Sequence, residues 1–213
     1  MKPTEQEWRK VVEAIEQSLP VYDSVSEKIS LNLASRARMR AVQYLTTRRS
    51  DWTLDLGVGP GTSTRMLLAN SFGRVVGLEP SILLLKNANR NFRKGFYPVL
   101  GVSEQMPFKD GCLGSILTCF ALRDVRDLKT SMDEISRTAG NRGRLGIVDI
   151  GKPESAIPRG FISFYVKHGM PLLSCLATRR RVKGNPFRMI VPTFNRLVSN
   201  EALLRMVGRV FGS

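Results

Sequence analysis

The stretch Leu54-Asp55-Leu56-Gly57-Val58-Gly59-Pro60-Gly61-Thr62 decides the fold of this chain. It ends a short apolar run over 52–56 and opens a segment, 62–70, whose apolar residues have helical spacing. Glycine lets the backbone turn tightly and lets a ligand come close. A strand, a glycine loop and a helix in this order predict a parallel α/β unit, with a ligand at the carboxyl end of the strand.

The spacing of the glycines separates two classes of cofactor. A dinucleotide site needs GxGxxG, but here Thr62 stands at the third glycine position. The carboxylate of Asp55 would repel a pyrophosphate, whereas it suits a cofactor that carries an ammonium and a sulfonium. Glu79 ends the next apolar run and can accept hydrogen bonds from both hydroxyls of a ribose. We therefore expect S-adenosylmethionine, with a glycine turn that binds no ligand as the alternative.

Strands and helices alternate along the rest of the chain. Apolar runs predict strands at 52–56, 74–78, 97–102, 115–120 and 144–150. Helices are predicted at 3–18, 31–48, 62–70, 81–92, 128–139 (closed by Gly140) and 199–210. The inward residues of the second are Leu31, Leu33, Ala34, Ala37, Ala41 and Leu45. This alternation is typical of an α/β, Rossmann-like fold, in which a mostly parallel sheet carries helices on both faces.

Four segments follow from this pattern. We expect N-terminal helices on the substrate side in 1–50 and the cofactor-binding α/β core in 51–152. Prolines interrupt 153–198, which we interpret as a mostly helical, basic insertion that forms a lid. The last segment, 199–213, is expected to hold a C-terminal helix of the core.

The chain is strongly basic, with a formal net charge of +15. No acidic residue occurs between Glu154 and Glu201, a stretch that contains Arg159, Lys167, Arg179, Arg180, Arg181, Lys183, Arg188 and Arg196. A second acid-free stretch, between Glu27 and Asp51, contains Lys28, Arg36, Arg38, Arg40, Arg48 and Arg49. Such surfaces attract nucleic acid, anionic lipid or acidic proteins, and a solvated face that aids solubility is the alternative.

Cysteine and histidine usage indicates a cytoplasmic protein without a metal site. Cys112, Cys119 and Cys175 form no CxxC pair, and with His168 they show no metal-ligand spacing. The charged N-terminus is unlike an export signal. The apolar segment 161–177 has Lys167 and His168 at its middle and is too short to span a bilayer. His168 is a candidate base if the insertion covers the pocket, and a surface or packing role is the alternative.

Four segments of the chain resemble one family. They are Tyr22-Asp23 with Ile29-Ser30, the loop 55–61, the motifs SEQMPF (103–108) and FALRDV (120–125), and GRLGIVDIGKP (143–153). In these segments the chain is similar to the UbiE-type C-methyltransferases of ubiquinone and menaquinone biosynthesis, within the class I S-adenosylmethionine-dependent methyltransferases. The resemblance runs from about residue 20 to residue 212.

The resemblance implies transfer of a methyl group to a ring carbon of a prenylated quinol, which leaves S-adenosylhomocysteine. It implies that Arg123 stabilises a phenolate or orients a water and that Asp124 accepts the phenolic proton. A surface ion pair is the alternative for both. Tyr22, Asp23 and Tyr165 are expected to contact the substrate, with core packing as the alternative for Tyr165. The implied cofactor-binding residues are Asp55, Gly57, Gly59, Gly61, Thr62, Glu79, Pro80, Ser103, Glu104 and Phe120.

The chain departs from the family pattern at several positions. Asp124 stands where the family usually has asparagine, and Leu113-Gly114 replaces a usual Phe-Asp. Val102 stands where many members have a polar residue that reads the adenine amine, which leaves the backbone of Ser103 to face the adenine. The family's fold normally closes with two more strands where 208–212 lie, so we expect five strands or a sheet without its closing pair.

Three functions remain open from the sequence. The first is a methyltransferase for a small, lipid-like aromatic, with the basic insertion held peripherally against anionic membrane. The second is a nucleic-acid methyltransferase, which the charge favours, although 118–121 lacks the [ND]PP[YF] motif of base-amine methylation. The third is a non-enzymatic binding protein that has lost tight cofactor binding. A homodimer is a further expectation.

Overall fold

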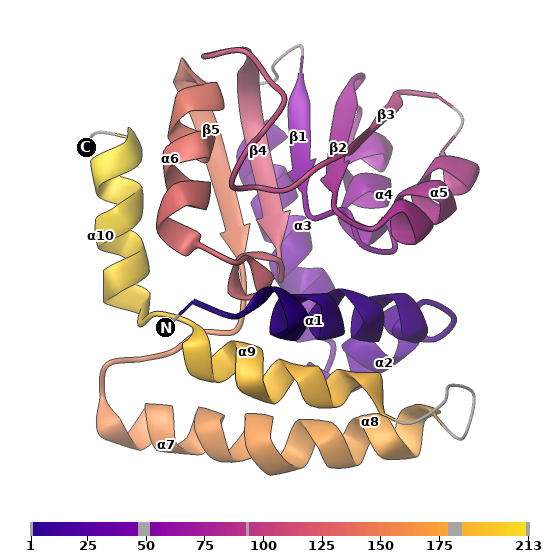
Figure 1. Cartoon of the computed structure of the whole chain (residues 1–213), viewed down its shortest axis with the longest axis vertical. Coiled ribbons are helices and arrows are strands. Elements are labelled where there is room, and N and C mark those ends of the chain that lie inside the picture. The colour runs from indigo at the N-terminus through magenta and orange to yellow at the C-terminus, as the bar shows by residue number, and fades with distance from the viewer. Residues whose placement is uncertain (1, 47–51, 93, 179–184, 212–213) are drawn as a thin grey trace. The chain divides into compact units, whose positions relative to one another are not determined.

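The computed structural model describes residues 2–46, 52–92, 94–178 and 185–211 (Figure 1). They belong to two compact units. A sheet unit is built from residues 35–149, and a helical unit combines residues 1–34 with residues 150–213. The helical unit therefore draws on both ends of the sequence.

The sheet unit is centred on five parallel strands in the order β3-β2-β1-β4-β5 (Figure 1). The strands are β1 Thr53–Leu56, β2 Val75–Glu79, β3 Phe96–Leu100, β4 Leu113–Cys119 and β5 Ala139–Val148. The first strand, β1, lies in the middle of the sheet. The chain then forms β2 and β3 on one side of β1, and β4 and β5 on the other side. Its direction of winding therefore reverses between β1 and β4, which is where open α/β sheets bind ligands.

The strand register brings three strand ends to one edge of the sheet. Leu56 of β1 lies opposite Leu78 of β2 and Thr118 of β4. Gly57, Glu79 and Cys119 come next on these three strands. They therefore lie together at the carboxyl edge.

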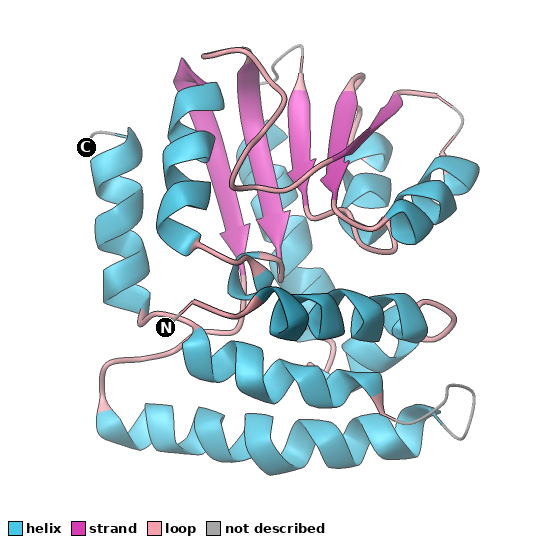
Figure 2. Cartoon of the chain, viewed as in Figure 1, coloured by secondary structure: helices cyan, strands magenta, loops and turns pink. Residues whose placement is uncertain are grey.

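Helices cover both faces of this sheet, as the sequence predicted (Figure 2). One face carries α3 Leu33–Thr46, α4 Thr62–Ala69 and α5 Ile82–Asn91, and the other carries α6 Leu128–Thr138. The core of the first face is made by Val42, Leu45, Val58, Leu67, Phe72, Val75, Leu85, Ala88, Phe96, Leu117, Cys119 and Val148. Every residue of β1 and β2 is buried, as expected for parallel strands that are covered on both sides.

Helix starts follow ordinary capping chemistry. The Ser81 hydroxyl accepts a hydrogen bond from the Leu84 backbone N–H at 3.1 Å and so caps α5. Asp127 caps α6, because its Oδ1 accepts from the N–H groups of Lys129 and Thr130 at 3.1 and 3.4 Å. These caps fix where each helix leaves the carboxyl edge of the sheet.

The helical unit consists of α1 Glu5–Ser18, α2 Tyr22–Ile29, α7 Ala156–Phe164, the π-helical η2 Tyr165–Gly169, α8 Met170–Thr178, the 3₁₀ turn η3 Pro186–Met189, α9 Ile190–Arg196 and α10 Asn200–Phe211. The segments α7, η2 and α8 follow one another without a break and form one long helix (Figure 1). The core of the helical unit contains Val21, Val25, Ile29, Val166, Met170, Phe187 and Phe194. In the part of the chain that the structure describes, no helix has both the length and the apolar character needed to cross a membrane.

Lys152 ties three parts of the helical unit together. Its ammonium donates to the backbone carbonyls of Asn195 and Leu197 at 3.1 and 2.8 Å, at the end of α9. Its backbone N–H donates to the Asn200 side chain at 2.7 Å, at the start of α10. Lys152 thereby fixes the two ends of the α9–α10 connection.

Three sequence predictions about the helices were wrong in detail. Leu31 and Leu33 were predicted to face inward but are 65% and 60% exposed. The reason is that Leu31 and Asn32 have φ of 52° and 63°, so the chain turns before α3 begins. The helix α2 was not predicted, and Gly140 lies within β5 rather than closing α6.

Candidate active site

The glycine loop turns directly after β1. Gly57, Gly59 and Gly61 have φ of 78°, 52° and 91°, a conformation that other residues rarely adopt. A Cβ on Gly57 would lie 2.4 Å from the Cβ of Ala121, and one on Gly61 would lie 2.7 Å from the Phe92 ring. A Cβ on Gly59 would meet nothing within 4 Å. The loop is therefore packed from behind at Gly57 and Gly61 and faces open space at Gly59.

Asp55 is a completely buried carboxylate on β1. Its Oδ2 accepts a hydrogen bond from the Thr64 hydroxyl at 2.6 Å, and its Oδ1 has no hydrogen-bond partner among the described residues. Burial raises the pKa of Asp55 to about 7, although the Thr64 hydrogen bond and the charge of Arg38 act in the opposite direction. A buried acceptor left without a partner costs about 1–3 kcal/mol, so Oδ1 is ready for a ligand's donor.

Glu79 lies at the end of β2 and holds the tip of the loop. Its Oε2 accepts from the Gly59 backbone N–H at 2.9 Å, and its Oε1 accepts from the Ser81 N–H at 3.0 Å. A carboxylate oxygen has two lone pairs and can accept more than one hydrogen bond. Pro80, the next residue, is half-buried, as is Thr62 at the start of α4.

These residues fit the cofactor that the sequence predicts. Among the described residues, Asp55 offers a buried oxygen without a hydrogen-bond partner, and no atom would lie within 4 Å of a Cβ on Gly59. Glu79 presents a carboxylate beside Gly59. Two acids at one strand edge would repel an anionic ligand and favour a cation. They gather here although the chain as a whole carries a charge of +15.

The loop that contains Ser103 and Glu104 is fastened to α6. The Ser103 and Ser131 hydroxyls are 2.8 Å apart, so one donates to the other. Oε1 of Glu104 accepts from the N–H groups of Arg126 and Asp127 at 2.6 and 3.1 Å. Glu104 therefore orders the chain that leads into α6, whatever contact it also makes with a ligand.

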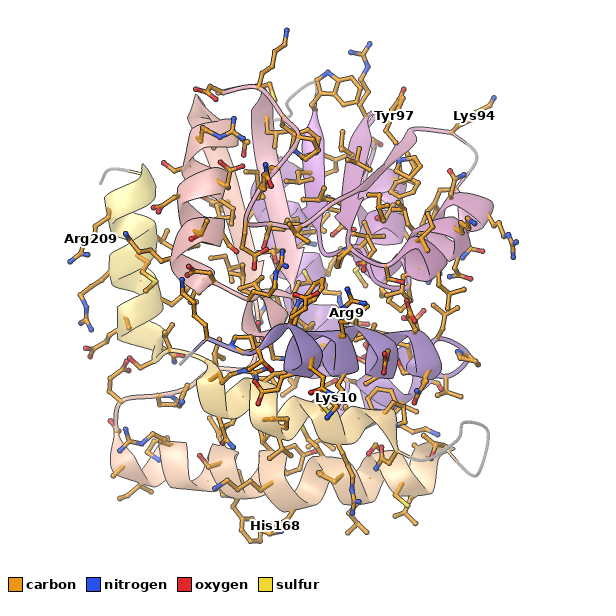
Figure 3. The ribbon with its side chains drawn as sticks, viewed as in Figure 1. Arg9, Lys10, Lys94, Tyr97, His168 and Arg209 are labelled. Carbon is orange, nitrogen blue, oxygen red and sulfur yellow. The ribbon has the colours of Figure 1, made fainter. Side chains whose placement is uncertain are left out.

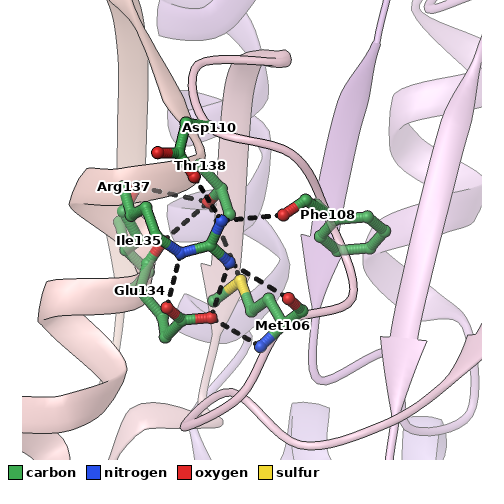
Figure 4. A network of polar contacts seen from close by, with 7 residues as sticks. All are labelled: Met106, Phe108, Asp110, Glu134, Ile135, Arg137 and Thr138. Carbon is green, nitrogen blue, oxygen red and sulfur yellow. Dashed lines mark hydrogen bonds and ion pairs between the residues drawn. The ribbon is translucent and has the colours of Figure 1, made fainter.

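A second set of contacts fixes the same loop further along (Figure 4). The Arg137 guanidinium donates to the carbonyls of Phe108 and Met106 at 2.8 and 3.1 Å, and to Asp110 and Glu134 at 2.7 and 2.6 Å. Glu134 in turn accepts from the Met106 N–H at 2.7 Å. The hydrogen bonds from Arg137 and from the Met106 backbone hold the pKa of Glu134 below its ordinary value.

Arg123 lies beyond the end of β4, in the turn η1 Leu122–Asp124. Its Nη1 donates to Asp149 Oδ1 at 2.7 Å, and its Nε lies 3.7 Å from Asp124 Oδ1. The three side chains are 9%, 6% and 16% exposed for Arg123, Asp149 and Asp124, so this is not the solvated surface ion pair that was the alternative. A mostly dehydrated guanidinium between two carboxylates is held in one orientation.

Phe120 connects this group with the interior. Its φ is 60°, which is unusual for a non-glycine residue, and its backbone N–H donates to the Val148 carbonyl at 2.6 Å. The guanidinium carbons of Arg38 and Arg123 lie 4.7 and 5.5 Å from its ring centroid. The ring thus lies in contact range of two cationic groups at the carboxyl edge.

The sequence interpretation missed two residues of this site. Arg38 was counted as part of a basic, polyanion-attracting surface, but it is 2% exposed. Its position in the inward row Ala34-Arg38-Val42-Leu45 of α3 could have revealed this. Asp149 comes directly after β5, just as Asp55 and Glu79 lie near the ends of β1 and β2. The rule that ligands bind at the carboxyl ends of strands would therefore have found Asp149 as well.

The predicted substrate residues lie in the helical unit. Tyr22 and Tyr165 are partly buried against its core, with the Tyr22 and Phe187 ring centroids 6.2 Å apart. The Tyr165 hydroxyl donates to the Ile29 carbonyl at 3.0 Å, and burial raises its pKa. Asp23 is exposed. His168 is also exposed and projects from the long helix, with its ring centroid 5.0 Å from that of Phe164 (Figure 3).

The comparison with protein families decides what this site belongs to. Residues 1–184 match the model of the ubiE/COQ5 methyltransferase family. The chain belongs to this family. It is a methyltransferase that depends on S-adenosylmethionine, and the glycine loop with Asp55 and Glu79 is the place in the fold that suits this cofactor.

Relatives of this ubiE/COQ5 member include a demethylmenaquinone methyltransferase from Thermotoga maritima. It is 27% identical over 157 residues, which are 73% of this chain and 68% of the relative. A 2-phytyl-1,4-naphtoquinone methyltransferase from Synechococcus elongatus is 27% identical over 158 residues, or 71% of this chain and 68% of the relative.

Solved structures agree on the fold of this ubiE/COQ5 member. A SAM-dependent methyltransferase from Aquifex aeolicus superposes with a TM-score of 0.55 at 16% identity, over 87% of each chain. The YcgJ protein from Bacillus subtilis gives a TM-score of 0.57 at 15% identity, over 80% of this chain and 88% of that one. At these identities the likeness establishes the Rossmann-like methyltransferase fold alone.

Proposed function

We propose that this enzyme methylates a ring carbon of a prenylated quinol, the class of acceptor that the names of its relatives indicate. The observation that carries the proposal is the Arg123–Asp149 pair, held at 2.7 Å at the same sheet edge as the glycine loop. An electron-rich ring carbon is a sufficient nucleophile once its phenol is deprotonated. A fixed guanidinium beside the ring supplies the charge that favours that phenolate.

S-Adenosylmethionine supplies a methyl group that its sulfonium has already activated, and S-adenosylhomocysteine is left. We assign its binding to Asp55, Gly57, Gly59, Gly61, Thr62, Glu79, Pro80, Ser103, Glu104 and Phe120. Asp55 takes the cationic end, and Glu79 takes the ribose hydroxyls. Val102 cannot hydrogen bond to an adenine through its side chain, so the Ser103 backbone is the remaining group there.

The chain's own contribution is alignment and proton removal. Asp124 accepts the phenolic proton, since its carboxylate is 16% exposed and lies beside Arg123. Asp149 orients Arg123 by accepting its Nη1–H, and the positive charge of the oriented guanidinium would stabilise the phenolate. The remaining residues of the site then need only to exclude water and to hold the ring carbon in line with the methyl group and its sulfur.

Tyr22, Asp23 and Tyr165 are proposed as the acceptor side of the protein. The partly buried Tyr22 ring beside Phe187 gives an apolar wall for a prenyl chain. For Tyr165 the hydrogen bond to Ile29 supports core packing as its main role. Among the described residues, the ring contact of His168 with Phe164 does not support a role as a base.

Two functions that the sequence left open are not favoured by the family. Nucleic-acid methylation rested on the charge, and a non-enzymatic binding protein rested on the departures at Val102 and Gly114. Within the described ranges, no three His, Cys, Asp or Glu side chains are grouped to hold a metal ion. We propose a metal-independent cytoplasmic enzyme that acts at the membrane surface, as a monomer or homodimer; EDTA should leave its rate unchanged.

The test is methyl transfer with a short-chain demethylmenaquinol and labelled S-adenosylmethionine, with the product mapped by mass spectrometry. We expect one CH₂ added on a ring carbon and no label in tRNA or duplex DNA. Arg123→Met should lower kcat by about 10²–10³-fold, as loss of one preorganised donor does elsewhere. Lys129→Met, an exposed change on α6, is the matched control. Label in nucleic acid alone would overturn the proposal.

A further inference from the structure

The long helix α7–η2–α8 has an apolar face that none of the described residues covers. Ile157, Phe161, Phe164, Leu172 and Leu176 are 88%, 74%, 66%, 62% and 64% exposed. The opposite side is in the core of the helical unit, where Val166, Met170, Ser174 and Thr178 are at most 8% exposed. A surface helix normally turns a polar face outward, and a helix that is apolar on both sides is normally covered on both.

The π-helical segment keeps this face continuous. In an unbroken α-helix, Phe164 and Leu172 would point about 80° apart, because eight residues at 3.6 per turn overshoot two turns. A turn with i→i+5 hydrogen bonds takes up one extra residue, which reduces the difference to about 20°. Gly169 permits this geometry, since a Cβ there would lie 2.5 Å from the Tyr165 ring. The two halves of the apolar face therefore point the same way.

The charge around this face distinguishes three candidate partners: a second copy of the chain, nucleic acid and an anionic bilayer. The helix lies within the acid-free stretch between Glu154 and Glu201, and Arg159 and Lys167 are exposed on it. A second copy would bring this basic region against itself in a two-fold interface, so the like charges would repel. Nucleic acid suits the charge but not a row of five exposed apolar side chains. An anionic bilayer suits both, because phenylalanine and leucine enter the acyl boundary while Lys and Arg meet the headgroups.

We infer that the exposed face of α7–η2–α8 is a membrane-docking surface that lies in the plane of an anionic bilayer. Ile157, Phe161, Phe164, Leu172 and Leu176 insert among the acyl chains, and Arg159 and Lys167 stay at the headgroup level. This docking surface rests on the proposed function in one respect, namely that a prenylated acceptor resides in such a bilayer. Lipid binding itself is measured without any acceptor.

The experiment is vesicle flotation of the full chain with phosphatidylcholine alone or mixed with phosphatidylglycerol. We expect binding to the mixed vesicles that falls as salt is raised to about 0.5 M, where charges are screened over about 4 Å or more. The double variant F161S/F164S should bind at least about tenfold more weakly, because two phenylalanines no longer enter the apolar layer. The matched control L83S/L204S removes two apolar side chains that are 51% and 69% exposed elsewhere and should bind like the wild type.

Two further measurements keep the outcomes distinct. Circular dichroism melting shows whether F161S/F164S is folded, and its methyl transfer to a detergent-dispersed quinol should equal that of the wild type. No flotation of the wild type with anionic vesicles, or equal flotation of F161S/F164S, would overturn the docking surface. A wild-type dimer that F161S/F164S converts to monomer, without lipid binding, would assign the face to a second copy instead. Loss of methyl transfer with flotation intact would count only against the proposed function.

Discussion

At the level of single residues, the site contains a carboxyl group, Asp55, whose burial raises the free energy of its ionised form. Asp55 is fully buried with one oxygen unpartnered among the described residues, and its pKa is raised to about 7. The folded enzyme without cofactor therefore holds a proton on Asp55 over a range of pH where an unfolded chain has released it. A bound cation reverses this preference, so cofactor binding and proton release from Asp55 are linked.

That linkage predicts how cofactor affinity depends on pH. Raising the pH from 6 to 8 should tighten S-adenosylmethionine binding, because the cation binds the ionised form of Asp55. Asp55→Asn should bind weakly and without this pH dependence, as measured by calorimetry. In unliganded protein, the melting temperature of the wild type should fall relative to Asp55→Asn between pH 5 and pH 8, since ionisation of a raised-pKa acid costs stability. A difference that is flat with pH would contradict this.

The glycine loop gives a second prediction at this scale. Gly57→Ala should lower stability by about 1–3 kcal/mol, because its φ of 78° is strained for alanine and its Cβ would overlap that of Ala121. Gly73→Ala is the matched control, since a Cβ there meets nothing within 4 Å. Chemical denaturation compares the two; equal stability would show that the loop adapts without strain.

The residues of the glycine loop were predicted from the sequence, whereas their neighbours Arg38 and Asp149 were missed. Asp55 and Glu79 lie near the ends of apolar runs, so the rule that ligands bind at strand ends finds them. Arg38 was missed because a charge on a helix is ordinarily assigned to solvent, although its place in the inward row of α3 indicates burial. The structure shows that it is 2% exposed and lies beside the Phe120 ring. The pairing of Arg123 with Asp149 joins the turn after β4 to the residue after β5, and local pattern carries no information on such pairs.

At the level of elements, one face of α6 holds the whole loop between β3 and β4. Ser131, Glu134 and Arg137 stand at intervals of three residues on α6 and contact Ser103, Met106 and Phe108 in turn. Residues three apart on a helix lie on one side of it. The loop that carries Ser103 is therefore positioned by α6 in addition to its own turn, in which the Gln105 N–H donates to the Val102 carbonyl at 3.3 Å.

Breaking the Arg137 cluster should loosen this loop without unfolding the sheet. Arg137→Gln removes the donors to Met106 and Phe108, and we expect faster amide exchange over 104–110 and several-fold weaker cofactor binding. Hydrogen exchange with mass spectrometry measures the first effect. The difference from wild type should shrink at acidic pH, because the lowered pKa of Glu134 gives stabilisation that is lost when its carboxylate is protonated.

The control for this change is Arg205→Gln. Arg205 pairs with Glu201 at 3.3 Å on the surface of α10, with both side chains more than half exposed, so its loss should cost little. If both variants change exchange over 104–110 equally, the loop does not depend on the Arg137 cluster.

Element boundaries show what periodicity can and cannot supply. Strands β1 to β4 and the helices α4, α5 and α6 were predicted to within two or three residues, because buried strands and amphipathic helices leave distinct patterns. The start of β5 was wrong, since the strand was predicted from residue 144 but begins at Ala139. The helix α2 was missed because Tyr22–Ile29 is only eight residues long. The π turn at Tyr165–Gly169 was not predictable, since it depends on a ring packing over one glycine.

At the level of the whole molecule, the two units divide the work. The sheet unit contains the acids of the glycine loop and the Arg123 group, and the helical unit contains the proposed acceptor side and the exposed apolar face. The roles proposed from sequence for 1–50 and 153–198 remain proposals about the helical unit. Ligand effects should therefore be unequal between the units.

S-Adenosylhomocysteine should protect the sheet unit selectively. We expect slower amide exchange at 57–62, 79–82 and 103–106 on binding, because these backbone segments surround the proposed cofactor position. The core-facing amides of α8 should change little. Protection that is confined to the helical unit would place the cofactor elsewhere.

The helical unit has a further consequence for how the chain is made. Its core joins Val21, Val25 and Ile29 to Met170, Phe187 and Phe194, which are separated by the entire sheet unit. At a synthesis rate of about 5–20 residues per second, some 8–30 seconds pass between the emergence of α2 and that of α9. During that interval, Val21 and the two α2 side chains Val25 and Ile29 lack their native partners while the sheet can already form. During this interval the nascent chain exposes an apolar segment to which a chaperone that suppresses aggregation would bind. The segment is buried once α9 has been synthesised and packs against it.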